Sequence, residues 1–514
     1  MSENTQHIVV VGGGSAGWLS ACFIAASQNS ETTTVTLIES PNIPTLGVGE
    51  GTWPSMRNTL NTIGIPEAQF LSVCNASFKQ GSKFVGWRDG TDSYYHPFMV
   101  PGGYNEINLA AHWQAHYSGT PYDYAFCPQP EVCDHFLAPK QLATPDYAFV
   151  TNYGYHFDAG KLTALLTEHG VNNLGIRHVV DDVIAIHSHP SGDIQGLETR
   201  HHEILSGDMF IDCSGMRGLL IHGHYQIPWH RVGDTLLNDS AVASQVKYAD
   251  DNAPIQSTTI ATAQPAGWSW DIGLYHRRGV GLSYASSHLG KEAAEETLAK
   301  HIESTGASTD EVSMRHLSFT PGYRTEFWHK NCLAIGMSAG FIEPLEASAL
   351  AMVELSLAML TEEFPQNRAH MEMVSKRFNK RFDYRWQRVI DFVKLHYVLS
   401  ERSEDYWLAQ RAPETLPDAL KDWLALWQYQ APSRHDFIEN EEVFSSTSYQ
   451  FVLYGMQFKT RFGASATPPA AQKRAHRLHT ELQQHQQKLL AALPTNRDYL
   501  ATLRQHLSQH RNTA

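Results

Sequence analysis

The chain has 514 residues, and its 39 Lys and Arg against 53 Asp and Glu give a formal net charge of −14. The acidic balance argues against a nucleic-acid-binding protein, because such a protein needs a basic face to meet phosphates. Hydrophobic residues make up 42% of the chain, which supports a packed core and excludes wholesale disorder. Six cysteines without a C-x-x-C pair predict neither a disulfide scaffold nor a zinc or iron–sulfur site, so no metal is expected.

An apolar run at residues 8–26 raises the question of a signal peptide or a membrane span. No Lys or Arg precedes this run, and four glycines interrupt it. The other long apolar run, at 347–360, is too short to span a membrane and carries Glu354. The sequence therefore predicts a soluble, cytoplasmic protein with reduced thiols and no membrane partner.

The predicted elements begin with a strand, a glycine turn, a helix and a second strand, at 7–11, 12–17, 18–26 and 34–38. A Gly- and Pro-rich region at 41–54 and aromatic loops at 84–150 follow. A helix is then expected at 155–170, with strands at 179–186, 198–205 and 209–211. Alternating apolar and polar residues predict an antiparallel sheet at 240–290. The remainder reads as a strand at 331–335, a long helix from Pro344 to about Phe364, and a mostly helical C-terminal part.

The glycine turn fits the G-x-G-x-x-G pattern of a dinucleotide site. Gly12 permits the tight turn, Gly14 lets the backbone approach a pyrophosphate, and Gly17 lets helix and strand pack closely. Ser15 and Ala16 complete a helix N-terminus whose N–H groups suit an anion. Glu39 ends the second strand, where an acid binds ribose hydroxyls, so FAD or NAD is favoured over NADP.

Two further segments favour FAD over NAD. Leu46-Gly47-Val48-Gly49-Glu50-Gly51-Thr52 is a second glycine-rich stretch that can wrap part of a large cofactor. Phe210-Ile211-Asp212-Cys213-Ser214-Gly215 is a buried strand ending in an acid, which suits a ribityl chain or a pyrophosphate. Each segment alone is equally compatible with an ordinary strand and turn.

A series of short motifs then runs in order through residues 5–360. They are Gly12–Gly17, Gly47-Val48-Gly49-Glu50, Ser77-Phe78-Lys79-Gln80-Gly81, His96-Pro97-Phe98, Tyr155-His156-Phe157-Asp158, Asp212-Cys213-Ser214-Gly215, Trp268-Ser269-Trp270-Asp271-Ile272 and Gly340-Phe341-Ile342-Glu343-Pro344-Leu345-Glu346. On these motifs the chain resembles the flavin-dependent tryptophan halogenases, and the resemblance is weaker beyond residue 360.

The resemblance implies a fold and a reaction. Reduced FAD (FADH2) reacts with O2 to a flavin C4a-hydroperoxide, which oxidises chloride or bromide to hypohalous acid. The acid then passes through an internal channel to a separate aromatic pocket, where an indole-type ring is halogenated. No second dinucleotide fingerprint is visible, so a separate flavin reductase is expected to supply FADH2. A homodimer is a family expectation only.

By resemblance, Lys79 and Glu346 are the catalytic residues. A lysine ammonium can donate a hydrogen bond to hypohalous acid, or its amine can be N-halogenated. A carboxylate beside the ring can stabilise the cationic intermediate, accept its proton or polarise the acid. From the residues alone, Lys79 would be read as a solvated surface lysine and Glu346 as a glutamate placed for the helix dipole, and Glu343 competes with Glu346.

The resemblance also assigns the halide, cofactor and substrate contacts. Halide is expected at the backbone amides of Ser348 and Ala349, Gly340 joins the cofactor site, and Ala347 replaces a usual Ser. Trp268 and Trp270 would separate substrate from flavin, although Trp-x-Trp on a strand is also typical of a core stripe. The expected substrate-pocket residues are His96, Phe98, Trp268, Trp270, Phe444, Tyr449 and Tyr454, with Phe451 as a further candidate. The groups that grip free tryptophan are not evident at 443–448, so indole or a substituted indole is an equal candidate.

Two alternatives stay open at this point, namely a flavin-dependent aromatic monooxygenase and a non-catalytic flavin-bound protein. The predicted fold is α/β (α+β), with a G-x-G-x-x-G βαβ unit, mixed sheets and a mainly helical C-terminal module. Residues 1–360 are expected to form the FAD- and halide-binding domain, with pocket insertions at about 84–150 and 225–310. Residues 361–514 are expected to close the substrate pocket.

Overall fold

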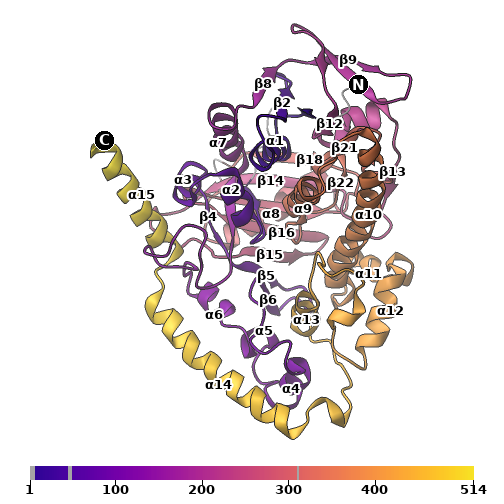
Figure 1. Ribbon diagram of the computed structural model, residues 1–514. Coiled ribbons are helices and arrows are strands. Elements are labelled where there is room, and N and C mark those ends of the chain that lie inside the picture. The colour runs from indigo at the N-terminus through magenta and orange to yellow at the C-terminus, as the bar shows by residue number, and fades with distance from the viewer. Residues whose placement is uncertain (1–5, 44–48, 310–311, 514) are drawn as a thin grey trace. The chain divides into compact units, whose positions relative to one another are not determined.

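The structure is a computed structural model that describes residues 6–43, 49–309 and 312–513 (Figure 1). The chain groups into two compact units, each built from three segments. Unit 1 comprises Met1–Ala76, Phe157–Val232 and Phe319–Trp386, and unit 2 comprises Ser77–His156, Gly233–Ser318 and Gln387–Ala514. The predicted division at residue 360 into a cofactor part and a pocket-closing part stays a prediction.

Unit 1 is built on a six-stranded sheet in which β1 and the four strands nearest to it run parallel, and the sixth strand, β20, pairs antiparallel with β21. The order is β20-β21-β12-β1-β2-β8, with bounds Trp328–His329, Cys332–Ala334, Met209–Asp212, His7–Val11, Thr34–Glu39 and Arg177–Val180. Ile8–Val11 and Val35–Ile38 are buried without alternation. Such continuous apolar strands are typical of parallel sheets covered on both faces.

The helices of unit 1 include α1, which packs against α2, α7 and α9. Their bounds are Ser15–Ser27, Met56–Ile63, Ala159–Asn172 and Ser348–Glu362, and α3 spans Glu67–Val73. The helix predicted at 155–170 is wrong in its first residues, because Gly154–Asp158 forms strand β7. Asp158 caps α7 by accepting a hydrogen bond from the Lys161 N–H at 3.2 Å, so the helix starts at Ala159.

Two small antiparallel sheets complete unit 1. One is β11-β10-β9, with bounds Leu205–Ser206, Ile194–Thr199 and Val183–Ser188, and the other is β13-β19-β22, with bounds Trp229–Arg231, Gly322–Arg324 and Gly340–Phe341. The single strands predicted at 179–186 and 198–205 are therefore each two shorter strands. The first is interrupted at Asp181, whose N–H bonds to the Glu39 carbonyl at the end of β2.

Unit 2 is built on a seven-stranded mixed sheet in the order β18-β14-β17-β16-β15-β5-β6. The bounds are Met314–Ser318, Ser240–Lys247, Arg277–Tyr284, Gly267–Gly273, Thr259–Gln264, Gly81–Val85 and Ser93–Pro97. β14 to β17 pair antiparallel, which confirms the sheet predicted at 240–290. β15 pairs parallel with β5, so the sheet is mixed, as the predicted fold class requires.

The remaining helices confirm the predicted helical C-terminal part. α10 (Arg368–Val398) contributes to both units, and unit 2 also holds α11 (Asp405–Gln410), α12 (Asp418–Trp427), α13 (Ser446–Gly455), α14 (Pro469–Ala492) and α15 (Asn496–Thr513). Strand β4 (Ser77–Lys79) and helices α4 (Leu109–His116), α5 (Tyr122–Ala125), α6 (Gln129–Asp134) and α8 (Lys291–Ser304) belong to unit 2 as well. Residues 84–150, predicted as loops, thus carry strands and short helices. Every helix in the described part of the chain is too short or too polar to cross a lipid bilayer.

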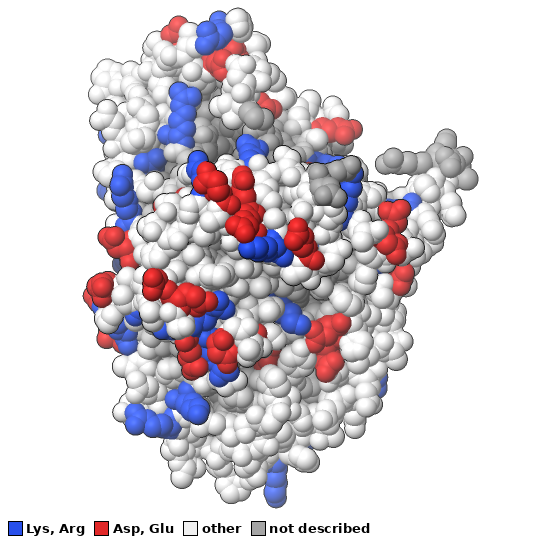
Figure 2. Space-filling view, turned by 180° about the vertical axis from the view of Figure 1, so that it is seen from behind, with Lys and Arg blue, Asp and Glu red and all other residues white. Residues whose placement is uncertain are grey.

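Acidic and basic side chains lie interspersed on the face of the molecule shown in Figure 2. Some exposed ion pairs lie within one helix, such as Lys300 with Glu296 at 2.7 Å and Lys376 with Glu372 at 3.2 Å. Such pairs contribute little stability, typically below about 1 kcal/mol each.

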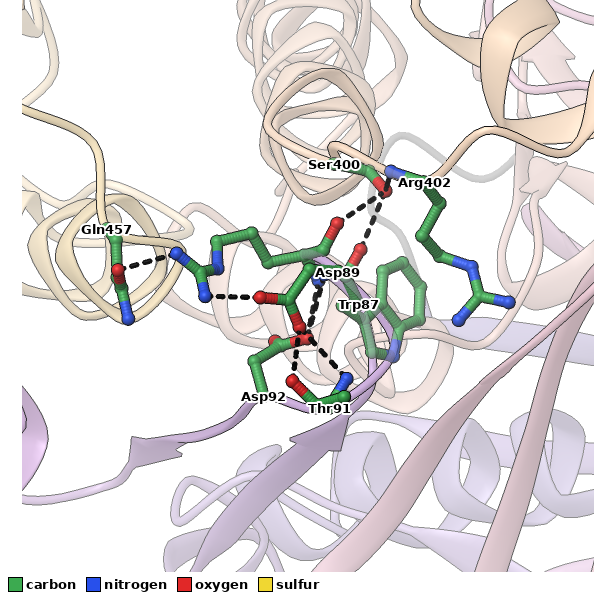
Figure 3. Close-up of polar contacts among 8 residues, drawn as sticks. Trp87, Asp89, Thr91, Asp92, Ser400, Arg402 and Gln457 are labelled. Carbon is green, nitrogen blue, oxygen red and sulfur yellow. Dashed lines mark hydrogen bonds and ion pairs between the residues drawn. The ribbon is translucent and has the colours of Figure 1, made fainter.

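The turn between β5 and β6 holds the ends of two helices (Figure 3). The Ser400 hydroxyl, just after α10, donates to the Trp87 carbonyl at 2.7 Å, and Arg402 Nη1 donates to the Gly86 carbonyl at 3.0 Å. Arg88 Nη1 donates to Gln457 Oε1, just after α13, at 2.5 Å. The turn itself is fixed by Asp89 and Asp92, whose side chains accept N–H groups from within it, as Figure 3 shows. We refer to this network as the hairpin clamp.

Candidate functional site

The glycine turn between β1 and α1 is required by backbone packing. Gly12 has φ +119°, and a methyl group there would stand 2.3 Å from the Cys213 carbonyl oxygen. A methyl group at Gly17 would stand 1.8 Å from the Gly12 carbonyl oxygen. Only glycine fits at either position, as the fingerprint demands of the tight turn and of close helix–strand packing.

The same turn also leaves the space that a pyrophosphate needs. No atom lies within 4 Å of a methyl group built on Gly14, which is the N-cap of α1. The N–H groups of the first turn, beginning at Ser15 and Ala16, lack partners within the helix. Glu39 Oε2 lies over Gly13, 1.6 Å from where a methyl group would stand, and Glu39 Oε1 contacts His178 Nε2 at 2.7 Å. An open glycine, a helix N-terminus and an acid at the end of β2 fit a dinucleotide with free ribose hydroxyls.

The second glycine-rich segment is described only in part, because Gly47 and Val48 lie outside the described residues. Gly49 and Glu50 belong to β3 (Gly49–Gly51). Burial, followed by repulsion from Asp158, raises the pKa of the Glu50 carboxyl to about 7. Glu50 therefore carries a proton for much of the time near neutral pH.

Asp212 is fully occupied by hydrogen bonds from its own chain. Its Oδ1 accepts the N–H and the hydroxyl of Ser214, at 3.0 and 2.6 Å, and its Oδ2 accepts the N–H groups of Leu220 and Ile221, each at 2.8 Å. A carboxylate has about four acceptor sites, so all are in use. The structure thus gives Asp212 the role of fixing the turn after β12, and direct contact with a cofactor stays a prediction.

Gly340, the last predicted cofactor residue, lies in β22 beneath an indole ring. A methyl group there would stand 2.4 Å from Cζ2 of Trp386. The absence of a side chain at Gly340 is therefore explained by this packing contact.

The segment from Pro344 to Ser348 forms a turn rather than the start of a helix. The Ala347 N–H bonds to the Pro344 carbonyl at 3.1 Å, and Ala347 takes the left-handed conformation with φ +53°. α9 therefore begins at Ser348, and the predicted start at Pro344 is wrong. Ser348 and Ala349 occupy its first turn, where N–H groups have no partners within the helix.

Glu346 is buried and sits at the tip of this turn. Its backbone carbonyl accepts a hydrogen bond from Trp53 Nε1 at 2.8 Å, which ties the turn to the segment after β3. Its competitor Glu343 is buried too, so burial does not distinguish the two.

Lys79 ends β4 and is also buried, with 1% of its surface exposed. Its Nζ lies 5.5 Å from the centroid of the Phe98 ring, an arrangement typical of a cation–π contact. Lys79 and Phe98 belong to unit 2 and Glu346 to unit 1, so the surroundings of the two predicted catalytic residues are described separately.

The backbone around Lys79 is fixed by buried hydrogen bonds. The Ser77 hydroxyl donates to the Gly273 carbonyl at 2.5 Å, and the Gln80 N–H donates to the Ser257 carbonyl at 2.6 Å. Gln80 Oε1 accepts the Thr151 hydroxyl at 2.6 Å. Lys79 therefore stands between two anchored neighbours, which restricts its side chain to one region of unit 2.

Three aromatic side chains contact the ring of His96, which lies near the end of β6. Phe392 of α10 lies 5.5 Å from the His96 ring, and Phe444 and Phe451 each lie 6.5 Å from it, between ring centroids. Phe392 and Phe444 are stacked at 3.9 Å. We call His96, Phe392, Phe444, Phe451 and Tyr449 the aromatic cluster, since Tyr449 contacts Phe392 at 4.9 Å.

The comparisons with known proteins agree over nearly the whole chain. The family model described as tryptophan halogenase matches residues 7–469. The chain is 31% identical to tryptophan 7-halogenase RebH of Lentzea aerocolonigenes, over 97% of this chain and 99% of that protein. A tryptophan halogenase crystal structure from Shewanella frigidimarina NCIMB 400 matches with 45% identity, a TM-score of 0.95 and 98% coverage of both chains. Tar14, a tryptophan C-6 flavin-dependent halogenase (chlorinase) from taromycin biosynthesis, matches with 30% identity, a TM-score of 0.91, and coverage of 97% and 100%.

The chain belongs to the tryptophan halogenase family. The resemblance inferred from the sequence motifs is thereby confirmed, as is the predicted enzyme class, a flavin-dependent halogenase. The predicted mixed α/β fold is confirmed as well.

Within unit 2 of this halogenase, the predicted pocket residues separate into four groups, one of which is the pair Trp268 and Trp270. His96, Phe444 and Tyr449 meet in the aromatic cluster, whereas Phe98 lies beside Lys79. Tyr454 contacts Tyr122 at 5.0 Å and Trp113 at 5.6 Å. It therefore belongs to a neighbouring set of rings, which Phe451 joins to the cluster by contacting Tyr122 at 5.8 Å.

Trp268 and Trp270 of the halogenase lie on one face of β16, with ring centroids 6.0 Å apart, as the Trp-x-Trp spacing predicts. Trp268 is completely buried and contacts Trp87 at 6.3 Å, while Trp270 lies over Gly281 and is half-buried. Packing explains the burial of Trp268. That the two tryptophans separate the substrate from the flavin stays a prediction.

Phe392 is the aromatic residue that sequence reasoning missed. It stands at the centre of the cluster, yet it is separated from His96 by almost 300 positions and carries no motif. The one local signal in the sequence is the apolar spacing of Val389, Ile390, Phe392, Val393 and Leu395, which indicates a core helix but not its partner.

Proposed function

We propose that this halogenase uses FADH2, O2 and chloride or bromide to form hypohalous acid and directs it to an indole-type ring through Lys79 and Glu346. Burial of Lys79 on an anchored strand, beside Phe98 and in the unit that holds the aromatic cluster, carries this proposal. A lysine is rarely buried completely unless paired or functional, because desolvation penalises its charge. The family supports an indole-type substrate and a flavin cofactor.

The cofactor would lie on the glycine turn of unit 1. Gly14 leaves room for the pyrophosphate, the N–H groups of Ser15, Ala16 and Gly17 face it, and Glu39 would accept the ribose hydroxyls. When bound in its reduced form, FAD supplies the electrons that activate O2. Gly47, Val48, Gly49 and Glu50 are the proposed strap of the same cofactor.

The halide would be held by the backbone amides at the start of α9. Ser348 and Ala349 present N–H groups there, and the helix dipole adds a partial positive charge. Backbone donors hold an anion without the tight salt bridge that would make it unreactive. The choice between chloride and bromide would depend on the shape of the turn at Ala347, whose left-handed conformation places those amides.

Lys79 and Glu346 would have different roles in halogen transfer. Lys79 would present the electrophile at a fixed point, by hydrogen bonding to hypohalous acid or by N-halogenation of its amine, which burial favours. Glu346 would stabilise the cationic ring and accept its proton. Proton loss restores the aromatic ring and completes the substitution.

The substrate ring would stack among His96, Phe98 and the phenylalanines of the aromatic cluster. Offset-stacked and edge-to-face contacts of this kind orient a planar ring. The hairpin clamp contributes by fixing the ends of α10 and α13, which supply Phe392 and Phe451. A separate flavin reductase would supply FADH2, and the homodimer remains an expectation.

The test is a comparison of Lys79→Ala with the matched control Lys83→Ala. Lys83, on the neighbouring strand β5, pairs with Asp134 at 2.9 Å near the surface and has no proposed role. Each protein is supplied with FAD, a flavin reductase, NADH and an indole panel, in parallel with chloride and bromide, and products are measured by mass spectrometry.

We expect Lys79→Ala to lose halogenation by about 100-fold or more while FAD affinity stays unchanged. Lys83→Ala should stay within about threefold of the wild type, because an exposed ion pair contributes little. Full activity of Lys79→Ala would refute the role of Lys79. An oxygenated product whose mass does not depend on the halide would indicate a monooxygenase instead.

A further inference from the structure

His156 is a completely buried histidine on β7, in the middle of the Tyr155-His156-Phe157-Asp158 motif. β7 pairs antiparallel with β4, so that Ser77 stands opposite His156 and Lys79 stands opposite Gly154. Side chains directly opposite one another, and their neighbours two positions along, share one face of such a ladder. Lys79 and His156 therefore lie on the same face as diagonal neighbours, within reach of a long side chain.

The two faces of this ladder differ in chemistry. On one face, the Phe78 ring contacts Tyr155 at 6.4 Å and is packed by Tyr153 and Tyr499 at 5.1 and 5.0 Å. On the other face stand Ser77, Lys79 and His156, all buried. A buried polar face needs its hydrogen bonds satisfied, so each polar group on it calls for a partner.

The two ring nitrogens of His156 are not equally satisfied. Nε2 lies 2.8 Å from Thr259 Oγ1, whereas Nδ1 has no hydrogen-bond partner within the described part of the chain. A buried polar atom without a partner costs stability, so Nδ1 calls for an explanation such as a catalytic role or an ordered water molecule.

Burial, together with the nearby Lys79 charge, lowers the pKa of His156 well below its usual range, so the imidazole is neutral. A neutral imidazole has one donor nitrogen and one acceptor nitrogen, and a lysine ammonium can only donate. Beside Lys79, the favoured arrangement has Nε2–H donating to Thr259 and a lone pair on Nδ1.

We propose that His156 is a positioning residue for Lys79, and that Nδ1 of His156 accepts a hydrogen bond from a water molecule that in turn accepts one from the lysine side chain. The inference rests on the proposed function of Lys79 in halogen transfer. Thr259 anchors the ring from β15, and His156 in turn limits where the lysine nitrogen can stand. Because a displacement of about 1 Å can cost about 100-fold in rate, such a restraint affects turnover more than binding.

The experiment compares His156→Gln with His156→Phe. Glutamine keeps a neutral acceptor and a donor for Thr259, whereas phenylalanine keeps only the size of the ring. The control is Tyr155→Phe, on the opposite face of the same strand. For each variant we would measure kcat and KM for the indole, FAD affinity, the thermal midpoint, and halide oxidation reported by a small diffusible halogen acceptor.

We expect kcat for the indole to fall by about 10- to 100-fold in His156→Phe and by less in His156→Gln. KM, FAD affinity and halide oxidation should stay unchanged, since they do not depend on where the Lys79 nitrogen stands. A role in packing alone predicts the reverse order, because phenylalanine keeps the size of the buried ring and glutamine does not. If His156→Phe does not fold, Thr259→Val removes the anchor alone, and the same loss of kcat with unchanged KM is expected.

The failure of this inference can be distinguished from that of the proposed function. If Lys79→Ala abolishes halogenation while His156→Phe, or Thr259→Val in its place, keeps wild-type kcat, the positioning role is wrong and the role of Lys79 stands. If Lys79→Ala keeps wild-type turnover, both proposals fail. Under the proposal, combining Lys79→Ala with His156→Gln lowers the rate no further than Lys79→Ala alone, and a further loss would contradict it.

Discussion

Glu354 offers a direct test of the electrostatics of unit 1. It is buried in α9, six residues after Ser348, and accepts hydrogen bonds from Ser55 Oγ at 2.9 Å and from Thr59 Oγ1 at 2.5 Å. Burial raises the pKa of its carboxyl from the ordinary value of 4.5 to about 7, although both hydroxyl donors oppose the shift. Replacing Glu354 with Gln removes this ionisation and keeps a polar group for the two hydroxyls.

The sign and size of the effect follow from proton linkage. Because the folded-state pKa is raised, the folded protein binds the proton more tightly than the unfolded chain, and stability falls as pH rises from about 4.5 to about 7. With about 1.36 kcal/mol per unit, the wild type loses about 2.5 kcal/mol through this one group between pH 5 and pH 8. The Glu354→Gln variant lacks this ionisation and does not lose that stability. Its free energy of unfolding relative to the wild type should therefore rise by about 2.5 kcal/mol from pH 5 to pH 8.

The assay is urea unfolding of wild type and Glu354→Gln at both pH values. The other described carboxyls with raised pKa, those of Glu50, Asp123 and Asp391, are common to both proteins and cancel in the difference. Glu372→Gln, an exposed position on α10, is the control and should show no pH-dependent difference. Parallel pH dependences of wild type and Glu354→Gln would refute the reasoning.

Three further outcomes are expected. Gly13→Ala should weaken FAD binding by about tenfold or more, because its methyl group would displace the Glu39 carboxylate, and an unchanged affinity in a flavin fluorescence titration would contradict this. Ala347→Gly should raise the free energy of unfolding by up to about 1 kcal/mol by relieving its positive φ, so a lower urea midpoint would argue against strain at this turn. Ser400→Ala removes the hydroxyl bond to the Trp87 carbonyl and should cost about 1 kcal/mol, and wild-type stability would show that the hairpin clamp does not depend on it.

The parts of the molecule predicted best from sequence are those specified by neighbouring residues. The strand, glycine turn and helix around Gly12 follow one another within about twenty positions, and local pattern is enough to place them. Much of the antiparallel sheet at 240–290 is equally accessible, because β15, β16 and β17 follow one another in the chain and pair in that order.

The errors occur where distant pairing decides the local structure. The residues from Tyr155 to Asp158 were predicted as helix, but pairing with β4, nearly eighty positions earlier, makes them a strand. Asp is a preferred N-cap residue, so Asp158 was the local signal that could have moved the predicted helix start to Ala159. Proline is common at a helix start, which is why the helix was predicted to begin at Pro344. The left-handed conformation of Ala347 instead closes a turn, and the helix begins after it.

The candidate site shows the same division. Lys79 was singled out through motif resemblance, whereas its burial, its anchored neighbours and His156 on the same face depend on strand pairing. The aromatic cluster joins three segments more than forty positions apart, so Phe392 could be found only in three dimensions. Asp212 is informative in another way, because a residue predicted to serve the cofactor proves to be saturated by its own turn.

The glycines of the N-terminal turn bear on how the family can be recognised in chains that have lost activity. A side chain at Gly12 or Gly17 would clash with backbone atoms. Selection for folding alone would therefore preserve both glycines in a protein that had lost cofactor binding. Gly14 faces open space, and a side chain there would do no harm to the fold. In a descendant of such a protein, glycines at the positions of Gly12 and Gly17 would therefore indicate only membership of the family. A bulky residue at the position of Gly14 would indicate that the protein no longer binds a flavin.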